Sequence, residues 1–372
     1  MDYVKNQART AKDDRHAWAE PGVEDLGGGL YRIPLPLPGD ALTAVNVYAM
    51  AGDDGVDLID AGMAITQARD RLTEGLGKLG FGLPDIRNFF ITHVHQDHYT
   101  LAVELRTTLR GQIALGEAEQ ANLAAIQAVS DGREQVGFIA MLDRMGAAGL
   151  ARQARAFLSA PGPSSPGPAG PQPQLQWSAP DRWLPDGALL DLPGRTLRAI
   201  HTPGHTSGHV VFHDESAGVL FAGDHVLPHI TPSIGFQPVI TRASLIQYLS
   251  SLRLMLTLPD TRLLPAHGPV KPSTHARVSE LLDHHETRLA QILDAAAAGP
   301  VTAFSVAGAI PWTRRQRKLA ELDPMNQLLA IGETAAHLEV LVARGQLAYA
   351  ESPEGVDLYS LAAAPDPVSS DN

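Results

Sequence analysis

The sequence has no cysteine and no long apolar run, and each absence narrows what the chain can be. Without cysteine, the 372 residues can form no disulfide and offer no thiolate as a nucleophile or metal ligand. No stretch approaches the roughly 20 apolar residues that a membrane-spanning helix needs, and the polar segment 1–20 lacks the apolar centre of a signal peptide. We therefore expect a cytoplasmic protein that does not bind a membrane.

Basic residues are also in the minority. Lys and Arg number 29 against 41 Asp and Glu, which gives a formal net charge of -12. Such a surface does not attract polyanions without a local basic patch, so nucleic-acid binding is not favoured. The compact basic run is expected to be a solvated loop or helix end, with contacts to phosphates of RNA or of a coenzyme-A-type substrate as the alternatives; it comprises Arg314, Arg315, Arg317 and Lys318.

Four candidate metal ligands occur within six residues, directly after the apolar stretch 88–91, which predicts a buried strand. In an extended backbone, side chains two residues apart point the same way, so His93 and His95 can converge on one ion. Asp97 and His98 fall where a helix over 99–110 is expected to begin, and they aim at a second position nearby. Imidazole and carboxylate suit zinc, and also iron or manganese.

This run resembles the HxHxDH signature of the metallo-β-lactamase superfamily. Further stretches resemble the family's other landmarks and follow in the expected order, namely LIDAG at 58–62, HTPGHT at 201–206, FAGDH at 221–225 and PAHG at 265–268. Together the five landmarks cover roughly residues 25–272. The resemblance implies an α/β fold, a four-layer αββα sandwich with its site at the strand ends.

The resemblance also implies two divalent metal ions, zinc first, with iron or manganese as alternatives. One ion would be held by His93, His95 and His205, and the other by Asp97, His98 and His267, with Asp224 as the bridge. A water between the ions would have its pKa lowered from about 15.7 to near 7 and become the nucleophile. Asp97 and Asp224 are the expected catalytic carboxylates; Asp97 has two possible duties, as ligand and as proton acceptor.

Asp60 is expected to orient a ligand histidine, and a polar strand cap is its structural alternative. His225 and His229 follow the bridging aspartate on the Pro-rich loop 227–238 and are candidates for contacting substrate. His201 and His209 are expected to be strand-end or surface residues. Several true β-lactamases of the superfamily carry a cysteine at the fourth landmark; Asp224 there resembles glyoxalase II and the related nucleases instead.

The chain is long for one domain, and its hydrophobic content of 44% suffices for a packed core. We expect an N-terminal arm (1–25), a catalytic domain (26–272) and a C-terminal domain (273–372). Within the catalytic domain, residues 117–173 form a helical insertion with a Pro/Gly-rich linker at 161–173. The insertion has two expected helices, broken near residues 131–132, which either pack on the core or cover the site as a lid.

After residue 272 the pattern predicts helices over 273–298 and 326–344, a short helix capped by Thr302, and two strands at 346–350 and 356–361. Three helices followed by a hairpin resemble a winged helix, as in the lactamase-β-like branch of the superfamily. Such a domain could bind RNA, contact substrate or pair two chains as a homodimer.

The leading expectation is a dinuclear metal-dependent hydrolase that cleaves a small ester or thioester, because the ligand set is complete and the insertion favours an enclosed pocket. Lactone and β-lactam opening use the same attack. A metal-dependent endoribonuclease is an alternative that the C-terminal domain supports and the net charge opposes. The last alternative is a mononuclear iron persulfide dioxygenase, which would leave the second metal position unfilled.

Overall fold

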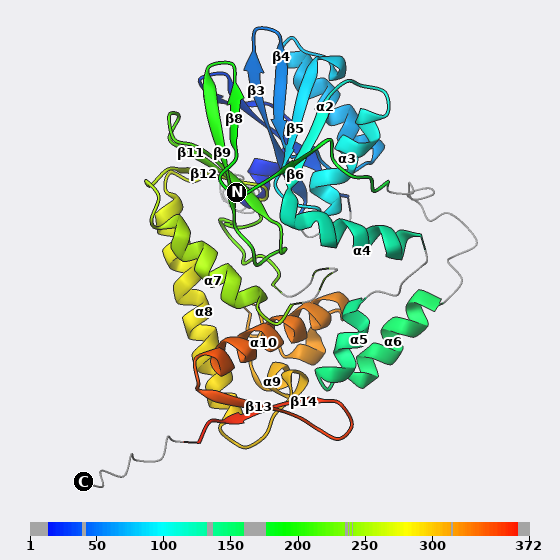
Figure 1. The fold of residues 1–372 in the computed structure, drawn as a ribbon, viewed down its shortest axis with the longest axis vertical. Helices are drawn as coiled ribbons and strands as arrows, with labels where there is room; N and C mark the ends of the chain where they lie inside the picture. Colours follow the sequence, from blue (N-terminus) through cyan, green and yellow to red (C-terminus); the bar gives the residue numbers. More distant parts are fainter. Residues whose placement is uncertain are drawn as a thin grey trace, which may run out of the picture.

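Two β-sheets stack face to face, and helices cover both outer faces (Figure 1). The computed structural model describes residues 14–38, 42–131, 137–159, 176–234, 237, 239, 241–313 and 315–363. The chain therefore forms the expected αββα sandwich. No helix in these ranges is long and apolar enough to cross a membrane.

The first sheet has seven strands in chain order, antiparallel from β1 to β4 and parallel from β4 to β7. Its strands are β1 (Glu24–Gly27), β2 (Leu30–Pro36), β3 (Ala44–Gly52), β4 (Gly55–Ile59), β5 (Ile86–Ile91), β6 (Gln112–Gly116) and β7 (Arg182–Leu184). β5 contains the strand predicted from the apolar stretch 88–91. The two longest strands of this sheet are β2 and β3, and β2 pairs over its whole length with β3, from Leu30 with Met50 to Pro36 with Ala44.

The second sheet has five strands in the order β12-β11-β10-β9-β8, with one parallel pair, β11 and β12. Its strands are β8 (Leu189–Leu192), β9 (Arg195–His201), β10 (Val210–Asp214), β11 (Val219–Gly223) and β12 (Arg262–Pro265). Aromatic rings fill the space between the sheets. Tyr48 meets Phe221 edge to face at 5.4 Å, and Phe90 meets Phe212 at 6.1 Å.

Amphipathic helices close the outer faces. On the first sheet, α2 (Thr66–Lys78) and α3 (Gln96–Arg106) bury residues such as Leu72 and Leu101. On the second, α7 (Ser244–Met255) and α8 (Thr274–Ala296) bury residues such as Leu249. The helix expected at 99–110 begins earlier, so Asp97 and His98 lie in its first turn.

The C-terminal region continues from α8 into α9 (Ala303–Ala309), α10 (Pro324–Ala343) and a hairpin of β13 (Leu347–Glu351) and β14 (Asp357–Leu361). Thr302 caps α9 as predicted, because its hydroxyl accepts from the backbone N–H of Ser305 at 3.1 Å. An isolated bridge joins Val301 to Tyr359. The element order is the expected one, and a winged helix stays a prediction.

Where the structure describes it (117–131 and 137–159), the insertion contains three α-helices where two were expected: α4 (Gln120–Ser130), α5 (Gly137–Arg144) and α6 (Ala148–Ser159). The extra break falls at Gly146, whose φ of +81° suits glycine. Leu142 and Met145 are buried in one cluster with residues of α8, α9 and α10. The apolar face of α5 and α6 therefore packs on the C-terminal region, beside which Figure 1 places both helices.

Ion pairs reinforce this packing. Arg144 of α5 donates to Asp357 at 2.7 Å, and Arg242, just before α7, donates to the same carboxylate at 3.0 Å. The linker at 161–173 lies outside the described residues. The described part of the N-terminal arm packs on the sheet, because Arg32 donates to the carbonyl of Trp18 in the 3₁₀ helix η1 (Asp14–Ala19) at 2.7 Å.

Candidate metal centre

All seven histidines and aspartates expected at the site come together at one end of the sandwich. His93 and His95 follow β5, and Asp97 and His98 begin α3. The second sheet supplies the others, after β9, β11 and β12 respectively; they are His205, Asp224 and His267. The group therefore spans the ends of both sheets, where a rigid scaffold holds loop side chains in place.

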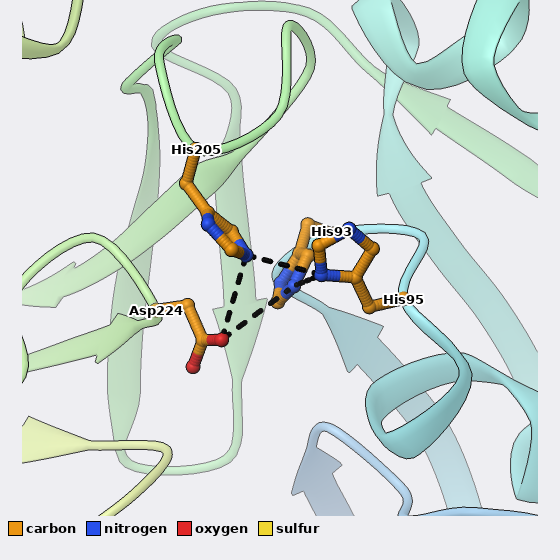
Figure 2. A group of neighbouring side chains, drawn as sticks. All are labelled: His93, His95, His205 and Asp224. Carbon is orange, nitrogen blue, oxygen red and sulfur yellow. Dashed lines mark hydrogen bonds and ion pairs between the residues drawn. The ribbon is translucent and has the colours of Figure 1, made fainter. Parts of the chain in front are cut away.

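The first group consists of His93, His95, His205 and Asp224, whose candidate ligand atoms all lie within 4.8 Å of one another (Figure 2). His95 Nδ1 lies 2.9 Å from His93 Nε2 and 3.0 Å from His205 Nε2. Three imidazoles and one carboxylate meet here from two different sheets. Zinc commonly takes four such ligands.

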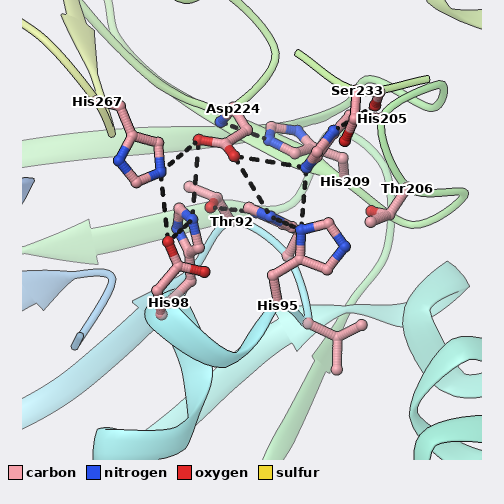
Figure 3. Close-up of polar contacts among 12 residues, drawn as sticks. Thr92, His95, His98, His205, Thr206, His209, Asp224, Ser233 and His267 are labelled. Carbon is pink, nitrogen blue, oxygen red and sulfur yellow. Dashed lines mark hydrogen bonds and ion pairs between the residues drawn. The ribbon is translucent and has the colours of Figure 1, made fainter. Parts of the chain in front are cut away.

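The second group consists of Asp97, His98 and His267, within the same limit of 4.8 Å. Asp97 Oδ2 lies 3.4 Å from His267 Nε2 and 3.5 Å from His98 Nε2. Figure 3 shows His98 and His267 on the opposite side of Asp224 from His95 and His205. The two groups thus flank one shared carboxylate.

Asp224 turns one oxygen toward each group. Its Oδ2 lies 3.5 Å from His205 Nε2 and 4.0 Å from His93 Nε2. Its Oδ1 lies 3.3 Å from His267 Nε2 and 3.8 Å from His98 Nε2. One carboxylate can therefore serve as a ligand on both sides.

The unpaired polar atoms of the second group test whether these residues suit a metal. His98 Nε2, His267 Nε2 and Asp224 Oδ1 are buried and have no hydrogen-bond partner in the structure. Buried polar atoms without a partner are costly, and in native proteins they call for an explanation such as an ion. Because these three atoms face one another, a divalent cation that accepts nitrogen and oxygen ligands fits the group.

The two groups differ in how they hold protons. Burial lowers the pKa of His93, His95 and His205, that of His95 to about 3, so these rings are neutral and offer lone pairs. At His98 burial has the same tendency, but the carboxylates of Asp97, Asp60 and Asp224 outweigh it and raise the pKa to about 10. A cation entering the second group must therefore displace a proton.

The ring nitrogen opposite the candidate ligand atom has its own partner in four of the five histidines, and for His93 this is the Thr92 hydroxyl, 3.0 Å from Nδ1. His98 Nδ1 lies 2.8 Å from Asp60, His205 Nδ1 lies 2.8 Å from the Ser233 carbonyl, and His267 Nδ1 lies 2.7 Å from the Ala44 carbonyl. Such partners fix the tautomer and the orientation of a ligand ring. Asp60 itself has a φ of +59° and accepts from the backbone N–H of Thr92 at 2.8 Å.

The loop that carries His267 is held by β3. The amide of Asn46 donates to the carbonyls of Pro265 at 2.9 Å and Gly268 at 2.8 Å. The hydroxyl of Tyr48 donates to Pro265 at 2.8 Å, and burial raises the pKa of Tyr48 far above its usual range. The second sheet's last ligand loop is thus fastened to the first sheet.

Two buried residues beside the site were not foreseen. His209 lies directly before β10, in agreement with an expected strand-end position, but it is fully buried and not on the surface, and its Nε2 accepts from the backbone N–H of Asp224 at 3.2 Å. Its spacing of four residues from His205 was the available signal. Glu119 is also fully buried and contacts the loops of both sheets, although nothing in the sequence around it indicates a site.

The two candidate substrate histidines lie in different surroundings. His225 is buried, with its ring 6.0 Å from His209 and 5.3 Å from Tyr248, so it does not face solvent. His229 lines a cavity of 460 Å³ together with Ala17, Trp18, Glu24, Arg32, Pro269 and Val270. None of the seven candidate ligands lines this cavity, although Pro269 follows His267 closely in the chain.

The sequence profile of the metallo-beta-lactamase superfamily matches residues 40–267. Over 328 residues, 84% of this chain and 91% of the relative, the chain is 26% identical to the probable metallo-hydrolase YqjP of Bacillus subtilis. It is 36% identical over 108 residues to the lactamase-like protein ptaB of Pestalotiopsis fici. That match spans 29% of this chain and 32% of ptaB, about a third of the fungal protein.

Two solved structures share the fold over most of the chain. A metallo-beta-lactamase family protein from Thermus thermophilus superposes with a TM-score of 0.69 at 27% identity, covering 91% of this chain and 100% of that one. A beta-lactamase domain protein from Burkholderia ambifaria superposes with a TM-score of 0.67 at 23% identity, covering 91% and 95%. Both likenesses extend well past the last residue of the profile match.

Proposed function

This chain belongs to the metallo-beta-lactamase superfamily and is a hydrolase, and on that premise we propose that it cleaves a small ester or thioester at a dinuclear metal centre. The observation that carries the proposal is the two-sided position of Asp224, with one oxygen toward each group of candidate ligands. When bound, two divalent ions would lower the pKa of a shared water to near 7 and act as Lewis acids. Zinc is the first candidate because imidazole and carboxylate suit it.

The protein's own groups have distinct tasks in this proposal. His93, His95 and His205 would hold one ion; His98, His267 and Asp97 would hold the other; Asp224 would hold both. Asp60 keeps the His98 ring in place through the hydrogen bond at its Nδ1, 2.8 Å long.

Asp97 is the proposed proton acceptor. Its side chain is 15% exposed, compared with 9% for Asp224 and 2% for Asp60, so it is the carboxylate nearest solvent. Burial opposes its ionisation, but His98 and His267 outweigh burial and lower the pKa of Asp97. An ionised carboxylate at this edge can accept a proton from the nucleophile and pass it toward the leaving group.

The reacting bond would approach from the side of His95 and Asp97, because these two are partly exposed and the other five candidate ligands are buried. The Pro-rich loop contacts His205, whose Nδ1 lies 2.8 Å from the Ser233 carbonyl. Arg277 of α8 donates to the carbonyls of Leu227 at 2.6 Å and Ile230 at 3.0 Å and so holds this loop. A loop held beside the site in this way supports a small substrate over a long polymer.

The test is a substrate panel of acyl thioesters, simple esters, lactones, β-lactams, phosphodiesters and RNA, measured with zinc-loaded, chelated and reloaded protein. We expect thioester or ester cleavage that is lost on chelation and restored on reloading. Asp97→Ala should lower kcat by about 10²- to 10⁴-fold. Asp70→Ala, which removes an exposed carboxylate on α2, is the matched control and should leave kcat unchanged. Undiminished cleavage after exhaustive chelation would overturn the proposal.

An endoribonuclease is the second candidate, favoured by an exposed basic turn in the C-terminal domain that includes Arg315, Arg317 and Lys318. Contacts to an RNA backbone would make affinity fall steeply with salt. An electrophoretic shift with single-stranded RNA across a salt series, together with RNA cleavage in the panel, would favour this reading. Iron at about one ion per chain would favour persulfide oxidation instead.

A further inference from the structure

Glu119 is a buried carboxyl that the proposed chemistry does not use. It ends the short 3₁₀ helix η3 (Glu117–Glu119), at the start of the insertion and directly before α4. Its exposed fraction is 0%, and the salt bridges of the described residues include none to Glu119. Burial raises its pKa, and hydrogen bonds from Thr206 and Asn122 act against that shift. Burying a carboxyl group costs free energy of folding unless hydrogen bonds compensate for the lost contacts with water.

One oxygen of Glu119 touches both loops of the first metal group. Oε1 accepts a hydrogen bond from the hydroxyl of Thr206, the residue after His205. The same oxygen accepts from the backbone N–H of Val94 at 3.4 Å, and Val94 lies between His93 and His95. A single atom therefore bridges the His205 loop of the second sheet and the His93–His95 loop of the first.

The other oxygen connects the insertion to the same place. Oε2 accepts from the amide of Asn122 at 2.7 Å, and that amide also donates to the Ser207 hydroxyl at 3.0 Å. The oxygen of the Asn122 amide accepts from the backbone N–H of Val239 at 3.2 Å. The first turn of α4 thus contacts both the His205 loop and Val239, the residue just after the Pro-rich loop.

The backbones at this junction are in direct contact. A Cβ atom on Gly208 would lie 2.2 Å from the backbone nitrogen of Glu119, and one on Gly116 would lie 2.6 Å from the carbonyl oxygen of Gly208. Neither glycine could gain a side chain without a shift of the backbone. The backbone around Glu119 and the backbone of the His205 loop therefore pack against each other at two glycines, Gly116 and Gly208.

From this geometry we propose that Glu119 is a positioning residue that sets the spacing of the His205 loop against the His93–His95 loop, and so the geometry of the first metal group. The inference rests on the proposed metal centre. The spacing at stake is the 3.0 Å between His205 Nε2 and His95 Nδ1. Thr206, next to His205 in Figure 3, is the contact through which Glu119 acts on that loop.

The test is a pair of substitutions at Thr206, read by zinc titration against a chromophoric competitor, which yields two dissociation constants. Thr206→Val keeps the side-chain shape and removes the donor to Glu119. We expect one dissociation constant to rise about 10- to 100-fold, as for other outer partners of metal ligands, while the other keeps its wild-type value. Thr206→Ser restores the hydroxyl and should restore the affinity.

A matched control separates positioning from general stability. Asp214→Asn alters another fully buried carboxylate, at the end of β10 remote from the site, where it accepts from Ser216 at 2.7 Å and Ala217 at 2.9 Å. This variant should lower the melting temperature and leave both dissociation constants unchanged. If Thr206→Val does not fold, Asn122→Ala removes the second contact of Glu119 and should weaken the same single constant.

Cobalt substitution gives a readout besides affinity. The visible absorption bands of bound Co²⁺ report on ligand geometry. The bands of the ion in the first metal group should change in Thr206→Val and return to their wild-type form in Thr206→Ser. If wild-type protein binds two ions and Thr206→Val binds them with unchanged constants and spectrum, the positioning role is refuted. If wild-type protein binds no ion, the metal centre itself fails.

Discussion

Replacing Asp224 should affect both metal positions, whereas replacing His267 should affect one. The carboxylate of Asp224 presents Oδ2 to the first group at 3.5 Å from His205 and Oδ1 to the second group at 3.3 Å from His267. Asp224→Ala removes one candidate ligand from each side. His267→Ala leaves the first group complete, since its four ligand atoms do not include His267.

The magnitude follows from the size of known ligand effects. Loss of an outer partner of a ligand weakens metal binding about 10- to 100-fold, so loss of a ligand should exceed about 100-fold, or about 2.8 kcal/mol. Asp224 is the only carboxylate in the first group, which would retain three neutral imidazoles. The second group would keep Asp97, and we therefore expect the larger loss at the first position in Asp224→Ala.

The assay is metal content by mass spectrometry after dialysis at a series of buffered free zinc concentrations. Wild-type protein should approach two bound ions per chain. His267→Ala should bind one ion with unchanged affinity. Asp224→Ala should bind neither ion at the free zinc concentrations that fill both positions of wild type. Asp214→Asn is the control for loss of a buried carboxylate elsewhere and should match wild type. Equal loss of both ions in His267→Ala, or one undisturbed ion in Asp224→Ala, would refute the reasoning.

Three further predictions concern stability. Burial lowers the pKa of His337 to about 3, below the ordinary 6.5, so on acidification the ring takes up a proton in the unfolded protein before it does so in the folded protein. The free energy of unfolding should therefore fall as the pH drops from 6.5 toward 3, and this ring contributes at most about 1.4 kcal/mol per pH unit to that fall. His337→Gln should make the free energy of unfolding, measured in urea, depend less steeply on pH. Gly204→Ala should cost about 2 to 4 kcal/mol in the same assay, because φ is +144° and the new Cβ would lie 2.4 Å from Tyr248 Cβ; unchanged stability would contradict the packing. Asp357→Asn should cost about 1 to 3 kcal/mol by weakening its bonds to two arginines, and a loss that survives high salt in full would argue against charge as the cause.

Much of the fold was predictable because local patterns agree with the final structure. The apolar stretch at 88–91 became β5, and the histidine run after it lies at the end of that strand. The order of the five landmarks predicted the superfamily and the αββα layers, and both predictions are confirmed. The C-terminal helices and hairpin lie close to their predicted ranges, and Thr302 caps a helix as expected.

The contacts between distant segments were not predictable. The apolar face of α5, with Leu142 and Met145, could have packed on any exposed apolar surface, and only the three-dimensional structure shows that it meets α8, α9 and α10. Glu119 was missed for a related reason. A single glutamate before a helix is usually solvated, and its contacts with Val94 and Thr206 arise from segments 25 and 87 residues away.

The two-metal centre is the central claim, and anomalous diffraction at the zinc absorption edge from crystals of the zinc-loaded protein tests it most directly. We predict two peaks, one among His93, His95, His205 and Asp224 Oδ2, and one among Asp97, His98, His267 and Asp224 Oδ1. One peak only, or peaks away from these side chains, would contradict a shared dinuclear centre.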